Sequence, residues 1–175
     1  MPFKISLAAL IAAIFLFGAT TASSASAAPP DDACSLLTQA QVSAAVGVPV
    51  GAGSHVTPTY LKTCTWTPPG GSPKGVKAVT LSFQAADAYA GAKKLMEQTK
   101  TMMAEEKDKD ANQLVNASAS GIGDDAFYTS MGSNYTALMV KKGNVAFKVA
   151  MYGDLPTEKK KAMEKTLALQ ALSKL

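Results

Sequence analysis

The sequence predicts an α+β fold: one antiparallel sheet of about five to seven strands, with three helices packed mainly on one face. Two groups of short alternating runs are separated by Gly, Pro and Asn turns, which is typical of strands joined by hairpins. Two longer stretches carry apolar residues at helical spacing and have a polar opposite side. The chain has 175 residues, which is enough for one domain.

The first 27 residues have the pattern of a secretory signal peptide. Lys4 precedes an apolar run from Leu7 to Phe17, and Ala25-Ser26-Ala27 forms a small-residue cleavage site. An uncleaved membrane anchor is the alternative, but the apolar run is short for a span and no basic stop follows it. We therefore expect one domain over residues 28–175, exported to the periplasm or the medium, with no transmembrane segment in the mature chain.

The two cysteines are expected to form a structural disulfide, because cysteines of exported proteins usually pair. Cys34 and Cys64 would close a loop of 30 residues, for which the chain-entropy relation gives about 3.6 kcal/mol. A redox pair or a metal site is the alternative. Redox pairs usually lie two residues apart, and no histidine adjoins either cysteine in the sequence.

The first helix is short and has small apolar residues on its buried side. Either Ser35 or Thr38 can cap its start, and Gln41 stands three residues after Thr38, as in a capping box. Gly47 provides the stop, and Pro49 follows it. A helix with so small an apolar side must dock closely on another element.

A hairpin is expected after this helix. A short strand is predicted around residues 55–57, a second over 63–67, and a third over 76–83 beyond a Pro- and Gly-rich loop at 68–74. Cys64 and Trp66 fall on one face of the second strand, because alternate residues of a strand point the same way. Trp66 is therefore predicted to be a buried structural anchor rather than a ligand platform.

Residues 86–107 form the clearest predicted helix. Its apolar stripe comprises Tyr89, Ala92, Met96, Thr99 and Met103, widened by Leu95 and Met102.

A meander and a closing helix complete the domain. Strands are predicted at 126–131, 135–142 and 144–152, with tight turns between them. The final helix begins near Pro156, which is tolerated at an early helical position. Its predicted apolar stripe comprises Met163, Leu167, Ala168, Ala171, Leu172 and Leu175, and its predicted solvated side comprises Lys159, Lys160, Lys161 and Lys165.

The motifs Cys34-Ser35-Leu36-Leu37-Thr38, Cys64-Thr65-Trp66 and the run 121–127 together resemble a group of small bacterial cell-envelope proteins of unknown function. Many members of that group are lipoproteins, best known from actinobacteria. The similarity covers nearly the whole mature chain, although its motifs are short. The resemblance implies a Cys34–Cys64 disulfide and a PsbP-like sheet-and-helix fold, and it carries no catalytic residues. This chain lacks a lipid-attachment cysteine at the cleavage site, so the anchoring common in the group is not expected.

Three residues are weak candidates for a ligand-binding or catalytic site. His55 is the sole histidine and lies in a Gly- and Thr-rich crossing, where a solvated loop residue is the simpler interpretation. Asp124 and Asp125 could form a carboxylate pair, but a turn or strand start is the simpler role, and the oxygen spacing of a calcium loop is missing. The methionines 96, 102, 103, 131, 139, 151 and 163 would suit Cu(I), yet they fall on predicted core stripes. No metal or other cofactor is therefore predicted.

Charge and composition exclude nucleic acid as a partner. The chain has no arginine, and removal of Lys4 leaves 16 lysines against 13 acidic residues, a net charge of +3. Without arginine there is no planar fork for phosphate or guanine edges.

The leading hypothesis is a monomeric, exported, non-enzymatic module that binds an envelope protein, a small ligand or cell-wall material. Its exposed sheet face or the 68–74 hairpin tip would make the contact. The alternative is a small hydrolase that uses Asp124 and Asp125, which a pocket joining them to His55 would favour.

Overall fold

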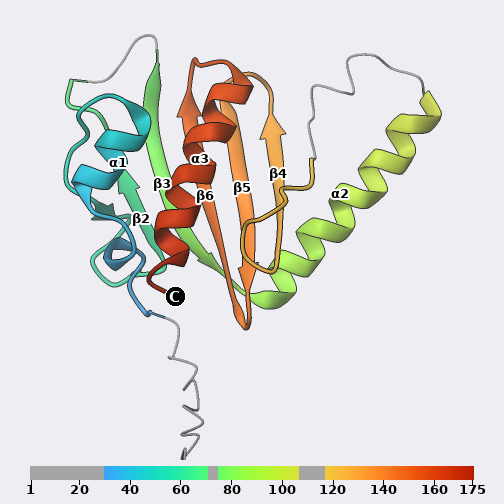
Figure 1. Ribbon diagram of the computed structural model, residues 1–175, viewed down its shortest axis with the longest axis horizontal. Coiled ribbons are helices and arrows are strands. Elements are labelled where there is room, and N and C mark those ends of the chain that lie inside the picture. Colours follow the sequence, from blue (N-terminus) through green and yellow to red (C-terminus); the bar gives the residue numbers. More distant parts are fainter. Residues whose placement is uncertain (1–29, 71–74, 107–116) are drawn as a thin grey trace, which may run out of the picture.

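The structure is a computed structural model that describes residues 30–70, 75–106 and 117–175, without the side chains of residues 100 and 102–106. It contains one antiparallel six-stranded sheet in the order β1-β2-β3-β6-β5-β4, together with three α-helices, which confirms the predicted α+β fold (Figure 1). The elements are a 3-10 turn η1 (Ala33–Ser35), α1 (Gln39–Val46), β1 (Ser54–His55), β2 (Thr63–Trp66), β3 (Val76–Gln84), α2 (Ala86–Glu106), β4 (Asp125–Met131), β5 (Tyr135–Lys142), β6 (Val145–Gly153) and α3 (Thr157–Leu172).

Helix α1 begins and ends at the capping residues that the sequence predicts. Thr38, one of the two predicted caps, accepts a hydrogen bond from the Gln41 amide, and the Gln41 side chain accepts one from the Thr38 amide. These two bonds satisfy amides that a helix start leaves without partners. Gly47 ends the helix at φ 73°, a left-handed conformation in which a side chain would be strained.

A disulfide between Cys34 and Cys64 joins this segment to the sheet. Cys64 and Trp66 lie on the same face of β2, as predicted, and Trp66 is only 1% exposed. Both side chains pack into the main core together with Leu36 and Leu37. The disulfide therefore ties η1 to the core rather than to a surface loop.

Two helices cover one face of the sheet, which we call the α3 face. The apolar residues of α1 and α3 pack there against alternate residues of β2, β3, β5 and β6. The residues buried in this core include Val42, Val46, Trp66, Val79, Leu81, Leu138, Val140, Phe147, Val149, Leu167, Ala168 and Ala171.

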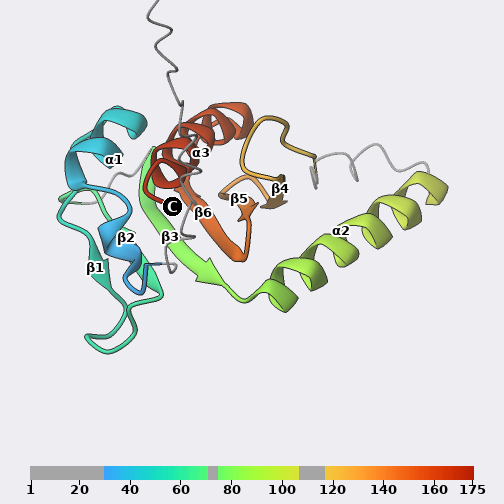
Figure 2. The same cartoon turned by 60° about the horizontal axis from the view of Figure 1, so that its bottom comes forward.

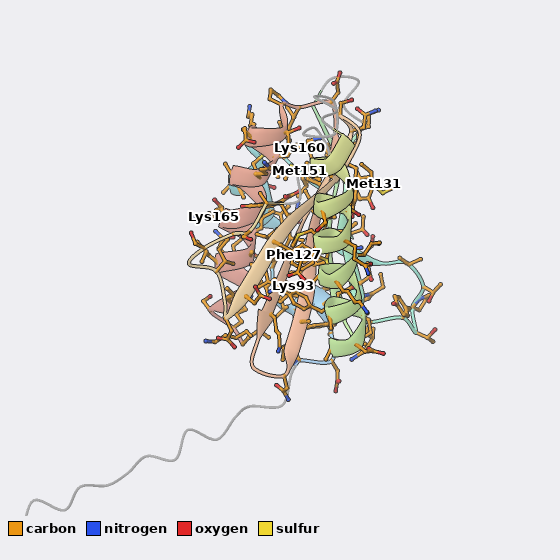
Figure 3. All side chains as sticks on the ribbon, turned by 90° about the vertical axis from the view of Figure 1, so that its right-hand side faces the viewer. Lys93, Phe127, Met131, Met151, Lys160 and Lys165 are labelled. Carbon is orange, nitrogen blue, oxygen red and sulfur yellow. A yellow bond between two sulfur atoms is a disulfide. The ribbon has the colours of Figure 1, made fainter. Side chains whose placement is uncertain are left out.

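The third helix lies on the opposite face, which we call the α2 face. Tyr89 and Met96 of α2 form a second core cluster with Phe127, Met139 and Ala146, and the rings of Tyr89 and Phe127 are 5.3 Å apart. Beyond these contacts α2 diverges from the sheet (Figures 1 and 2). In Figure 3, which looks onto the β4 edge, α2 and α3 lie on opposite sides of the sheet.

Several side chains lie elsewhere than the sequence predicted. Lys160 was placed on the solvated side of α3 but is completely buried, whereas Lys165 does point to solvent (Figure 3). Leu95 was placed on the apolar stripe of α2 and is 64% exposed, and Met131 was assigned to a core stripe and is 74% exposed. Helical and strand periodicity identifies a possible buried side, but the position of the partner element determines how wide that side is. The predicted contributions of Met102 and Met103 lie outside the described side chains.

Candidate functional site

The two adjacent carboxylates at the start of β4 are both engaged in local contacts. Asp124 lies in the turn before β4, where its Oδ2 accepts a 2.6 Å hydrogen bond from the Gly143 amide and its Oδ1 lies 3.2 Å from Lys142 Nζ. The Gly143 amide and then Lys142 lower the pKa of Asp124. The Asp124 carboxylate thus ties the β5–β6 turn to the start of β4.

Asp125 pairs with a lysine of α2. Its Oδ2 lies 2.5 Å from Lys93 Nζ, and this contact is the main cause of the lowered pKa of Asp125. Tyr89 lies beside the pair: burial and the Asp125 carboxylate raise the pKa of its hydroxyl, which makes no hydrogen bond of ordinary geometry. The Asp125–Lys93 pair holds the first half of α2 against the sheet.

His55 lies far from these carboxylates. It belongs to β1, and β1 and β4 are the two opposite edges of the sheet. Asp124, Asp125 and His55 therefore do not share one site, and the arrangement that would favour the hydrolase alternative is not formed between them.

The simpler interpretation of His55 as a solvated loop residue was wrong, because the ring is partly buried among three polar neighbours. Its Nε2 lies 3.3 Å from Asp32 Oδ1, and its Nδ1 lies 3.0 Å from the Thr63 carbonyl oxygen and 3.7 Å from Cys34 Sγ. Asp32 also accepts a 2.7 Å hydrogen bond from the Cys34 amide. The fold thus supplies an acid partner for His55 that sequence spacing did not indicate.

Asp32, Cys34 and His55 also place ligand-type atoms within 4.8 Å of one another. However, Cys34 Sγ is bonded to Cys64, and metal coordination by cysteine requires a free thiolate. The group is therefore not a metal site in this oxidised form.

A second polar cluster lies inside the α3 face. Lys160, Glu164 and Thr136 are all fully buried. Glu164 Oε1 accepts a 2.6 Å hydrogen bond from Thr136 Oγ1, while Oε2 has no hydrogen-bond partner. Lys160 Nζ donates to the carbonyl oxygens of Ser133 and Gly153. Burial raises the pKa of Glu164 to about 8 and lowers that of Lys160.

The α2 face carries a row of three large, partly exposed side chains at the end away from Phe127. Met131, Tyr135 and Tyr152 are consecutive cross-strand partners on β4, β5 and β6, and we call them the tyrosine row. Met131 is 74% exposed and Tyr152 is 40% exposed. The two tyrosine rings are tilted against each other with centroids 5.0 Å apart. The label of Met131 in Figure 3 lies on the α2 side of the sheet.

The next cross-strand row on the α2 face consists of small side chains. It contains Thr80, Ala150, Ala137 and Thr129, in the order of β3, β6, β5 and β4. Because these side chains are short, the tyrosine row stands above its neighbours on the same face. A ligand could contact Met131 and the Tyr152 ring where they are exposed.

Compared with known protein families, curated proteins and solved structures, the chain matches none of them. Within the described ranges, no helix has the length and apolar character needed to cross a bilayer.

Sequence reasoning missed both polar clusters and the tyrosine row. Tyr152 lies beside Tyr135 and Met131 because of the strand register, which the sequence does not show. The only advance signal for Glu164 was its place one residue after Met163 on the predicted buried stripe. A charged residue at such a position is ordinarily read as the edge of the stripe.

Proposed function

We propose that this protein is an exported, non-catalytic module that binds another protein through the tyrosine row on its α2 face. The observation that carries the proposal is the unequal covering of the sheet. Two helices bury the α3 face, whereas the described side chains of α2 contact the other face around Phe127, Met139 and Ala146 and through the Lys93–Asp125 pair. The disulfide is compatible with an oxidising compartment outside the cytoplasm.

The chemistry of the tyrosine row favours a protein partner. Tyrosine and methionine are enriched in protein interfaces, where they bury large areas at low conformational cost. An exposed, adjoining set of such residues marks an interaction surface more often than scattered single ones do. The Tyr135 and Tyr152 rings are tilted by 55°, so they do not form one flat platform for a sugar ring.

The test is position-specific photo-crosslinking in cells that export the protein. A benzophenone amino acid would replace Tyr152 in one variant and Leu169 in the matched control, which is 43% exposed on α3. We expect a discrete protein adduct from position 152, absent from position 169 and lost when Tyr135→Ser and Met131→Ser are added.

Each other result overturns part or all of the proposal. Equal adducts from both positions, or none from either, contradict a binding site at the tyrosine row. An adduct of twice the chain mass means that the row joins two copies of this chain. An adduct that sediments with cell-wall polysaccharide means that the partner is not a protein.

A further inference from the structure

We infer that the Cys34–Cys64 bond is an exchangeable redox bond, which Cys34 opens to an external dithiol while His55 stabilises the Cys34 thiolate. The inference stands apart from the binding surface proposed above, since the disulfide and His55 lie at β1 and β2, whereas the tyrosine row lies on β6, β5 and β4 in the other half of the sheet. It rests on three features of the disulfide environment: unequal burial of the sulfurs, the imidazole beside one of them, and the carboxylate behind that imidazole.

The two cysteines differ in access. Cys64 is completely buried on β2, whereas Cys34, at the chain's entry into the domain, is only partly buried. Of the two residues, Cys34 is the one that an incoming thiolate is expected to meet. Exchange disulfides commonly pair one accessible with one shielded sulfur, because access decides which sulfur is attacked.

His55 is placed to assist at Cys34. Its Nδ1 lies 3.7 Å from Cys34 Sγ. The Thr63 carbonyl oxygen lies at the same nitrogen, and the Asp32 carboxylate lies 3.3 Å from the other one, so both ring nitrogens face acceptors. An imidazole that carries a proton on both nitrogens favours the thiolate over the thiol of a neighbouring sulfur.

Asp32 is the positioning residue of this group. Its Oδ1 contacts both His55 Nε2 and the Cys34 amide, so one carboxylate orients the ring and the cysteine backbone together. In space, the Cys34 sulfur, the His55 imidazole and the Asp32 carboxylate follow one another in the order seen in thiol-based active sites. In the oxidised protein the bond to Cys64 occupies the sulfur.

One thiolate of the external dithiol attacks Cys34 Sγ, the Cys34–Cys64 bond breaks, and its electron pair leaves on Cys64 Sγ, which takes up a proton. The second thiolate of the dithiol then attacks the dithiol's first sulfur, which is bonded to Cys34 in the mixed disulfide. Cys34 leaves as a thiolate beside His55. The dithiol is oxidised to a disulfide, and the two cysteines are reduced by two electrons.

The first experiment measures the equilibrium of the full mature protein with dithiothreitol redox buffers, by alkylation and mass measurement. His55→Gln should lower the equilibrium constant for reduction at least tenfold, which corresponds to about 30 mV for a two-electron couple. Asp32→Asn should shift it in the same direction. The control is Asp31→Asn, which removes a neighbouring, almost fully exposed charge that contacts Lys62 rather than His55.

The direction in which the equilibrium constant for reduction changes distinguishes a lost redox role of His55 from a destabilised fold. A variant that only weakens the folded state would make the disulfide easier to reduce, since the reduced chain unfolds more readily. A change below twofold, or easier reduction in His55→Gln, overturns the inference.

A second experiment identifies the thiol source. In Cys64→Ser the Cys34 thiolate can carry out the reverse exchange: it attacks one sulfur of a partner's disulfide, and the partner's other sulfur leaves as a thiolate. Because Cys64 is then absent, no thiol of this protein resolves the mixed disulfide, and the partner stays attached. In exporting cells we expect a protein adduct on Cys34 that dithiothreitol releases, and its yield should fall when His55→Gln is added. A low-mass thiol adduct would assign the exchange to small thiols instead, and an unmodified Cys34 thiol would contradict the inference.

Discussion

Glu164 of α3 accepts a 2.6 Å hydrogen bond from Thr136 of β5 in a part of the core where both side chains are fully buried. One carboxylate oxygen is satisfied by this contact and the other has no hydrogen-bond partner. Burial without full pairing favours the neutral acid, which explains the pKa of about 8. The hydroxyl of Thr136, the charge of Lys160, the backbone of Met151 and the charge of Lys161 act against this shift but do not cancel it.

The buried acid should make stability depend on pH. The folded protein keeps a proton on Glu164 that the unfolded chain releases above its ordinary pKa of 4.5. Stability from this group is therefore complete below pH 4.5 and is lost as the pH rises toward 8, by an amount on the order of 4 kcal/mol. Glu164→Gln should flatten the decline in melting temperature between pH 5 and 8, measured by circular dichroism.

The control for this effect is Glu158→Gln, on the same helix. The Glu158 side chain is 82% exposed and contacts only Lys161 among the described ion pairs. The slope of melting temperature against pH should stay as in the unmodified protein. If Glu164→Gln also leaves that slope unchanged, the carboxyl is not held neutral in the fold.

Trp66→Ala should destabilise the domain strongly. The tryptophan is fully buried and packs with the disulfide in the main core. Truncating a buried aromatic residue costs about 3–5 kcal/mol, which is roughly a 10 °C loss in melting temperature for a domain of this size. Thermal unfolding with the disulfide intact measures it. Tyr60→Ala, at a half-exposed position, is the matched control, and an equally small shift in both variants would mean that Trp66 does not anchor the core.

Gly53→Ala and Gly91→Ala should have opposite effects. A Cβ at Gly53 would lie 2.7 Å from Cys64 Sγ and 2.8 Å from Trp66 Nε1, which is too close for either neighbour to remain in place. A Cβ at Gly91 of α2 would meet nothing within 4 Å, and alanine is the better helix former by about 1 kcal/mol. Denaturant midpoints of the two variants should move down and up respectively. A stabilised Gly53→Ala would show that the loop does not pack against the disulfide.

The N-terminus of the exported protein should be Ala28, directly after the Ala25-Ser26-Ala27 cleavage site. N-terminal sequencing of protein recovered from the periplasm or the medium checks this directly. An intact Met1, or a lipid-modified terminus, would contradict the predicted processing. Residues 1–29 lie outside the part of the chain that the structure describes.

Local chemistry was enough to predict most of the elements. The Thr38–Gln41 capping box and Gly47 bound α1, the Gly-containing turns at 132–134 and 143–144 separate the strands of the meander, and Pro156 precedes α3. Each of these features depends on residues within a few positions of one another. Turn and cap energies act at that range, so they can be read without knowing the fold. The inward side of β2 could also be predicted, because a disulfide partner requires it.

The functional features depend instead on contacts between distant segments. Alternation divides the residues of a single strand between two faces, but strand order and register brought Tyr135, Tyr152 and Met131 into one row. His55 met Asp32 and Cys34 because β1 pairs with β2 beside η1. Lys160 and Glu164 have ionisable side chains, and their burial followed from how closely α3 docks on β5 and β6. Pairing and docking are settled by the total area that the chain buries, a sum over the whole domain that no short stretch of residues contains.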